Sequence, residues 1–209
     1  MTNEPVRLFG PDTGPGVIVI HDWFGLLPGI VSYAERLGDA GFRTALVDIY
    51  EGETTTDPAE AEVLIDRFEQ PPALAVVKQA SERLTDTGPP PAAFGFSAGG
   101  WMAFQTAAAG LAGPVAAVYA VPGESSRDAI SNPVTLHMAA EDDFDPPDAA
   151  ERLAASLSAR EIEATVTTYP GTVHSFANQD VPQYDAEAAE RMFESVVSFL
   201  RRHATSGAS

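Results

Sequence analysis

Short apolar runs alternate with longer amphipathic segments along almost the whole chain, and this alternation restricts the fold more than any other feature of the sequence. Strands that alternate with helices build a mostly parallel central sheet that is flanked by helices on both faces. The pattern therefore predicts an α/β fold. The expected strands cover residues 17–20, 44–48, 92–96, 115–120, 134–139 and 163–169, and the expected helices cover residues 30–40, 57–70, 74–85, 99–109, 149–160 and 186–202.

The length of 209 residues fits one well-buried core and is short for two ordinary domains. Neither an internal repeat nor a long polar linker divides the sequence. We therefore expect a single domain over residues 1–209, with a frayed tail at residues 204–209.

Composition argues against several classes of function. The formal net charge of −18 repels phosphate backbones, so we expect no nucleic-acid partner. No apolar run is long enough to span a bilayer, and the first residues lack the basic and apolar regions of a signal peptide, so we expect a cytoplasmic protein without a membrane partner. The absence of cysteine excludes disulfides, thiolate nucleophiles and cysteine-ligated metals.

The segment from Gly95 to Gly100 matches the pattern G-x-S-x-G and lies between an expected strand and an expected helix. In that position a sharp turn holds Ser97 in a strained conformation, and the glycines on either side leave room for the turn. The turn lifts the hydroxyl group clear of the sheet and points the backbone N–H of Ala98 toward a developing oxyanion. An ordinary helix N-cap is the simpler interpretation of Ser97, but the surrounding strand and helix favour a nucleophile.

A serine nucleophile needs a base, and the chain has four histidines. His174 lies between the last expected strand and the last expected helix, where catalytic groups gather beyond the carboxyl ends of the strands. The chain order serine, acid, histidine is the order expected of α/β-hydrolases. His21 ends the first expected strand and is the competitor, although it precedes the serine. His137 is expected in the core, and His203 is expected at the end of the last helix.

The acid that orients the histidine is expected in the loop that follows residues 134–139. Four side chains there are candidates, namely Glu141, Asp142, Asp143 and Asp145. Asp145 precedes two prolines and is well explained as a helix N-cap. Spacing alone does not choose among the other three. A cation site is a further alternative, but the loop lacks the glycine and the ordered spacing of an EF-hand.

Taken together, these motifs resemble the dienelactone hydrolase family of α/β-hydrolases. Four segments carry the resemblance in the same order and spacing, namely residues 17–25, the G-x-S-x-G motif, residues 137–146 and residues 171–176. The resemblance implies a single-domain α/β-hydrolase fold without a large lid. The family places its catalytic aspartate four residues before a proline, which selects Asp142.

The resemblance also implies roles for the residues around the serine. The second oxyanion N–H would come from Trp23. Asp22 stands where family members often carry a glutamate that contacts the nucleophile and gates its activation, and a loop-stabilising Asx turn is the alternative. Dienelactone-specific enzymes clamp the substrate carboxylate with arginines, but Asn178 stands at one of these positions, and no motif assigns Arg67 to the other. The missing clamp argues against a dienelactone anion as the substrate.

Aromatic side chains near these motifs are candidates for an apolar acyl or alcohol site, and each is also a good core residue. Asp22 and Asn178 complete the set of candidate substrate-binding or gating residues. The aromatic candidates are Trp23, Phe24, Trp101, Phe144 and Phe176.

We therefore expect a serine hydrolase that cleaves a small carboxylic ester, or a related acyl bond, through an acyl-enzyme intermediate formed by Ser97, His174 and Asp142. It would need no cofactor and no metal, act on a small-molecule ester, and exist as a monomer or a small homo-oligomer. A thioesterase or an acyl transferase could use the same residues, because the pocket sets the leaving group and the acceptor. The alternative from another class is a non-catalytic binding protein of this fold.

Overall fold

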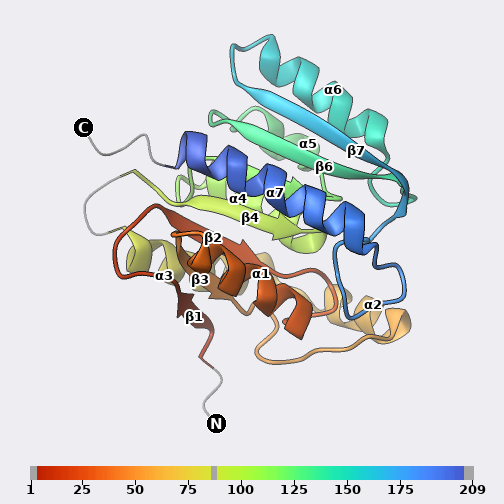
Figure 1. Ribbon diagram of the computed structural model, residues 1–209, viewed down its shortest axis with the longest axis horizontal. Helices are drawn as coiled ribbons and strands as arrows, with labels where there is room; N and C mark the ends of the chain where they lie inside the picture. Colours follow the sequence, from red (N-terminus) through yellow and green to blue (C-terminus); the bar gives the residue numbers. More distant parts are fainter. Residues whose placement is uncertain (1–3, 86–88, 205–209) are drawn as a thin grey trace.

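The computed structural model describes residues 4–85 and 89–204, which form one seven-stranded sheet. Its strands are β1 (Val6–Phe9), β2 (Gly16–Ile20), β3 (Arg43–Val47), β4 (Ala92–Phe96), β5 (Val115–Val118), β6 (Val134–Glu141) and β7 (Ala164–Val173). They lie in the order β1-β3-β2-β4-β5-β6-β7, and every neighbouring pair is parallel except β1 and β3. The predicted α/β class with a mostly parallel sheet is confirmed (Figure 1).

Helices cover both faces of this sheet (Figure 1). One face is covered by α1 (Pro28–Asp39) and α7 (Ala186–His203), and the other by α3 (Gln70–Leu84), α4 (Ala98–Ala108) and α6 (Pro147–Ser158). Two shorter helices, α2 (Pro58–Asp66) and α5 (Glu124–Arg127), lie in connections between elements. The part of the expected tail beyond residue 204 lies outside the described residues.

The apolar runs of the sequence form strands that are buried on both faces. In β2, Val17 and Val19 pack in the cluster under α1 and α7, whereas Ile18 and Ile20 pack in the cluster under α3 and α4. A strand covered on both faces needs a continuous apolar run, because successive side chains point in opposite directions. The run of four apolar residues at positions 17–20 is therefore explained by the helices that cover both faces of β2.

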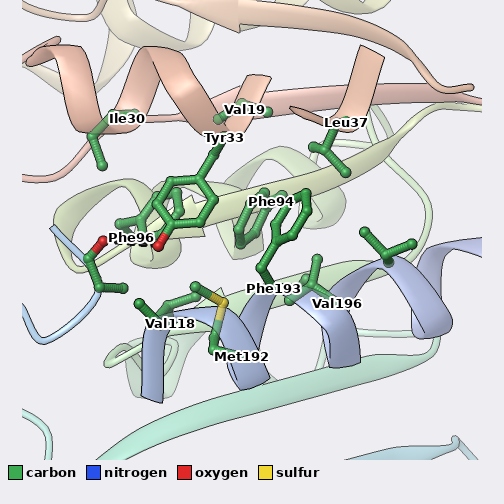
Figure 2. Packing of buried hydrophobic residues seen from close by; sticks show 14 of the residues in the cluster. Val19, Ile30, Tyr33, Leu37, Phe94, Phe96, Val118, Met192, Phe193 and Val196 are labelled. Atoms are coloured by element: carbon green, nitrogen blue, oxygen red, sulfur yellow. Dashed lines mark hydrogen bonds between the residues drawn. The ribbon is translucent and has the colours of Figure 1, made fainter. Parts of the chain in front are cut away.

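Aromatic rings join α1, β4 and α7 into the core of one face (Figure 2). The ring of Tyr33 lies 6.1 Å from that of Phe94 and 5.6 Å from that of Phe193, measured between centroids. The hydroxyl of Tyr33 donates a hydrogen bond of 2.9 Å to the carbonyl of Ala177. This core thereby anchors the segment between β7 and α7, which carries His174.

The structure differs from the predicted elements mainly at their ends. The predicted helix at residues 57–70 ends at Asp66, and α3 begins at Gln70 instead of Leu74. The two prolines after Gln70 lie in the first turn of α3, where a missing N–H costs no hydrogen bond. The antiparallel edge strand β1 was not predicted, because polar and apolar residues mix over its four positions.

β6 and β7 extend beyond their predicted ends, to Glu141 and Val173, and these two residues pair with each other after an irregularity at Ala139. The residues that follow the strands, Asp142 and His174, are therefore neighbours in space. No helix among residues 4–85 and 89–204 combines the length and the apolar character that a membrane span requires.

Candidate active site

The three side chains that we expected to act together each follow directly after a strand. Ser97 follows β4, Asp142 follows β6 and His174 follows β7. These strands are parallel members of one sheet, so their carboxyl ends share one edge. The topology brings the serine close to the histidine, although 77 residues separate them in the chain.

Ser97 sits on a strained turn, with φ of 50° and ψ of −117°. An added Cβ on Gly95 would lie 2.1 Å from the carbonyl oxygen of Gly99, and one on Gly99 would lie 2.2 Å from the carbonyl oxygen of His21. Real side chains do not tolerate such distances. The two glycines are thus required because α4 starts in close contact with β4 and with the end of β2.

The Ser97 hydroxyl lies 2.8 Å from Nε2 of His174, and Nδ1 of the same ring lies 2.8 Å from Oδ2 of Asp142. Ser97 makes no capping hydrogen bond to α4, so the interpretation of its side chain as an ordinary N-cap does not hold. When Nδ1 carries the proton that Asp142 accepts, the Nε2 lone pair faces the hydroxyl. That arrangement allows the imidazole to take the serine proton.

Among the four acidic candidates, Asp142 is the one that forms a hydrogen bond with the histidine. Its Oδ1 accepts hydrogen bonds from the backbone N–H groups of Phe144 (2.9 Å) and Asp145 (3.0 Å), which leaves Oδ2 for the imidazole. The Asp142 side chain is fully buried, whereas Glu141 and Asp143 are exposed. The predicted N-cap role of Asp145 is wrong, because α6 begins at Pro147 after Pro146 and has no side-chain cap.

The other three histidines form contacts that do not involve Ser97. The Nε2 of His21, the competitor, accepts the backbone N–H of Ile49 at 3.1 Å, and its ring is fully buried away from the serine hydroxyl. His137 lies in the core as expected, 2.8 Å from the hydroxyl of Tyr169, and burial lowers its pKa to about 3. His203 lies 3.2 Å from Glu163 at the end of α7.

The loop after β2 places Trp23 beside the serine, and both residues line the same cavity. Among the described residues, the backbone N–H groups of Trp23 and Ala98 donate no hydrogen bond to the protein. Both residues belong to the lining of the cavity that contains Ser97, and an oxyanion hole requires two such N–H groups without a protein acceptor. Neither group was identified by a charge or a polar side chain, so only the motif and the resemblance pointed to them.

Asp22 and Asn178 form a buried pair behind this loop. Oδ1 of Asp22 accepts the N–H of Phe24 at 3.0 Å, which is the Asx turn, and Oδ2 accepts the Asn178 amide at 2.8 Å. Burial raises the pKa of Asp22, while the hydrogen bonds from Asn178 and Phe24 oppose the shift. Both side chains are fully buried, and the cavity lining does not include them.

A cavity of about 800 Å³ opens over Ser97 and His174, and it is lined mostly by apolar groups. Three of the five predicted aromatic residues line it, namely Trp23, Trp101 and Phe144. The prediction for Phe24 and Phe176 is wrong, since both are buried in hydrophobic clusters outside the cavity. Residue type alone does not tell a pocket aromatic from a core aromatic.

Sequence reasoning missed the far wall of the cavity. This wall comes from α2 and from residues in the connections after α2, β5 and β6. The additional lining residues are Pro58, Ala59, Glu62, Ile65, Asp66, Phe68, Val121 and Asp145. Behind the imidazole, the buried ring of Tyr119 packs 4.7 Å from His174, measured between centroids. The one signal in the sequence was the weak amphipathicity of α2, and in the structure only Ala61 and Leu64 of this helix are buried.

Asp145 is the titratable group in the cavity whose pKa departs most from its ordinary value. The pKa of Asp145 is raised to about 6, chiefly by burial; the positive charge of a protonated His174 opposes the shift, the carboxylate of Asp142 adds to it, and a hydrogen bond from the backbone of Val121 opposes it. Asp145 is therefore mostly ionised at neutral and alkaline pH and mostly protonated below about pH 5. No group of three or more potential metal ligands occurs among the described residues.

The sequence profile described as "Dienelactone hydrolase family" matches residues 5–204. The chain belongs to the dienelactone hydrolase family. A curated relative, Protein usf from Aquifex pyrophilus, is 29% identical over 209 residues, which cover 92% of this chain and 90% of the relative. The expected family membership is thus confirmed, and with it the assignment of the chain to a family of hydrolases.

Solved structures share the fold of this family member. A dienelactone hydrolase-like promiscuous phosphotriesterase from metagenomic libraries superposes with a TM-score of 0.77 at 20% identity, covering 95% of this chain and 98% of that one. The monoacylglycerol lipase of Paleococcus ferrophilus superposes with a TM-score of 0.71 at 16% identity, covering 95% and 98%. At these identities the likeness concerns the fold, which is that of the α/β-hydrolases.

Proposed function

We propose that this protein is a serine hydrolase that cleaves small carboxylic esters through an acyl-enzyme intermediate. The observation that carries the proposal is the continuous line of hydrogen bonds from Ser97 through His174 to Asp142, each 2.8 Å long, at the floor of an apolar cavity. Membership of a hydrolase family supports it further.

The mechanism that follows is acyl transfer in two steps. His174 takes the proton of Ser97 as the hydroxyl oxygen attacks the ester carbonyl, and Asp142 stabilises the imidazolium that forms. The N–H groups of Trp23 and Ala98 donate hydrogen bonds to the negatively charged oxygen of the tetrahedral intermediate. The imidazolium then protonates the leaving alcohol. Water, deprotonated by His174, hydrolyses the acyl-enzyme and regenerates the serine.

Replacement of the nucleophile tests the proposal directly. We expect wild-type protein to hydrolyse p-nitrophenyl butyrate and to be labelled by a fluorophosphonate probe, and we expect Ser97→Ala to lose the labelling and at least about a thousandfold in kcat. The control is Ser158→Ala, a serine at the end of α6 and outside the cavity, which should be labelled like wild type.

The outcomes separate the alternatives. Wild-type protein that neither turns over the ester nor takes the label would contradict the proposal and favour the non-catalytic binding protein. A Ser97→Ala variant that is still labelled would show that another residue is the nucleophile.

A further inference from the structure

The charged groups that line the cavity are mostly acidic. Glu62 and Asp66 come from α2, and Asp145 comes from the loop before α6. No lysine or arginine occurs among the described lining residues, and His174 is the only basic side chain there. Glu62 and Asp66 are exposed at the cavity and Asp145 lies close enough to His174 to interact with it electrostatically, so the charge that these side chains bring to the lining is negative.

Apart from the N-terminal end of α4 at Ser97, which serves the proposed oxyanion hole, the nearby positive groups are engaged elsewhere. Arg67, directly after α2, forms an ion pair of 3.0 Å with Glu53 and lines a separate cavity. The positive N-terminal end of α2 is capped by Asp57, whose carboxylate accepts the N–H groups of Ala59 (2.8 Å) and Glu60 (3.3 Å). Neither group is therefore available to hold an anionic substrate.

Aromatic rings line the same space on two sides. On one side the rings of Phe68 and Trp101 meet edge to face with centroids 6.5 Å apart. On the other side the rings of Trp23 and Phe144 meet with centroids 5.8 Å apart. Aromatic faces attract cations, and tryptophan attracts them best. Such faces combined with carboxylates favour a substituted ammonium group, which has an apolar surface and a positive charge.

We propose that the cavity selects esters that carry a positively charged, alkylated ammonium group and discriminates against esters that carry a carboxylate. The ammonium group lies between the aromatic rings and the carboxylates of Glu62 and Asp66, while the ester carbonyl reaches Ser97. A cavity of about 800 Å³ is large enough for a small ester of this kind. This inference rests on the proposed function, and it names the substrate class of the same site.

Binding can be measured without turnover, because both tryptophans of the chain line the cavity. Intrinsic fluorescence of Ser97→Ala is titrated at pH 7, where Asp145 with its pKa of about 6 is mostly ionised and the phenolic ligands keep their hydroxyl protons. The ligands are 3-(trimethylammonio)phenol and 3-tert-butylphenol, which have the same shape and differ by one charge. We expect the cation to bind about tenfold more tightly, and we expect 3-hydroxybenzoate to bind more weakly than either.

Two carboxylate variants locate the preference in the cavity. The double variant Glu62→Gln/Asp66→Asn should lower the preference for the cation to about threefold or less. The matched control, Glu151→Gln/Glu194→Gln, removes two exposed carboxylates outside the cavity and should keep the tenfold preference. Sodium chloride at 0.5 M should reduce the preference of the parent protein, since exposed charges are screened.

Equal or tighter binding of the neutral phenol would overturn the inference, and so would an equal loss of preference in the control variant. Failure of the proposed function is recognised separately, by wild-type protein that hydrolyses no ester and takes no fluorophosphonate. A hydrolase that accepts p-nitrophenyl butyrate but shows no preference for the cation would contradict the inference alone.

Discussion

Asp145 illustrates how surroundings determine the behaviour of a single side chain. Its neighbours are His174, Asp142 and the apolar wall of the cavity, and burial raises its pKa to about 6. In an unfolded chain an aspartate has a pKa near 3.9. The folded protein therefore holds the Asp145 proton more tightly than the unfolded chain does.

The sign of the resulting pH effect follows from linkage. Below about pH 4 Asp145 is protonated in both states and costs nothing, whereas above about pH 6 its charge must be desolvated on folding. Asp145→Asn should therefore raise the free energy of unfolding by about 1–2 kcal/mol at pH 8 and leave it almost unchanged at pH 4. Urea unfolding of both proteins at the two pH values measures this, and equal differences at both values would contradict the linkage.

At this scale the sequence predicts the serine and the histidine, because their motifs need particular residue types at particular positions. It could not choose among Glu141, Asp142 and Asp143 from spacing, since all three follow one strand within a single turn. The distinction lies in the backbone geometry of that turn, which points two N–H groups at one Asp142 oxygen and leaves the other for the imidazole. The family resemblance selected Asp142, and this is the carboxylate that lies 2.8 Å from Nδ1 of His174.

Two loops meet at the Asp22–Asn178 pair, and the contact joins segments 156 residues apart. The loop after β2 carries the N–H of Trp23, and the segment after β7 carries His174. A buried hydrogen bond between them fixes one proposed catalytic group relative to the other. The pair thus holds the loop of Trp23 and the segment of His174 in place, although neither of its two side chains lines the cavity.

We expect Asn178→Ala to weaken this support. Loss of the amide leaves one oxygen of a fully buried carboxylate without its partner, which should lower the free energy of unfolding by about 1–3 kcal/mol. Because the loop that carries the Trp23 N–H is no longer tied down, kcat should fall by about tenfold or more with little change in KM. Steady-state kinetics on p-nitrophenyl butyrate and urea unfolding measure the two effects.

The control for this variant is Gln179→Ala at the next, exposed position. A loss of stability in Asn178→Ala with an unchanged kcat would mean that the pair is purely structural. An equal loss of kcat in the control would mean that the segment, and not the pair, positions the site.

At the scale of helices and strands, periodicity predicts the central strands and the edge strand β7 but not the edge strand β1. β2 and β4 have apolar runs because both of their faces are covered, whereas β1 pairs with only one neighbour and keeps Leu8 about half exposed. The role of α2 as a wall of the cavity was not predictable either, because this helix too is only partly covered by the rest of the protein. Pro58, Ala59 and Ile65 line the cavity and only Ala61 and Leu64 are buried, so the pattern of α2 resembles that of a poorly buried helix.

The whole molecule carries a net charge of −18, which opposes its compact state through self-repulsion. Added salt screens this repulsion, so we expect the midpoint of thermal unfolding at pH 8 to rise by roughly 3–8 °C between 0.02 and 0.5 M sodium chloride. At pH 5, closer to the isoelectric point of 4.3, the rise should be clearly smaller. Differential scanning calorimetry measures both series, and a midpoint that falls with salt at pH 8 would contradict the expectation.

The placement of Ser97, Asp142 and His174 after β4, β6 and β7 also has a consequence during synthesis of the protein. A chain emerging from the ribosome presents the serine long before the base, because 77 residues and three further strands must follow before His174 is made. Until β7 pairs with β6, the hydroxyl has no partner to accept its proton. A nascent or truncated chain that lacks β7 would accordingly have no esterase activity. The appearance of activity would show that β7 has been synthesised and has paired with β6.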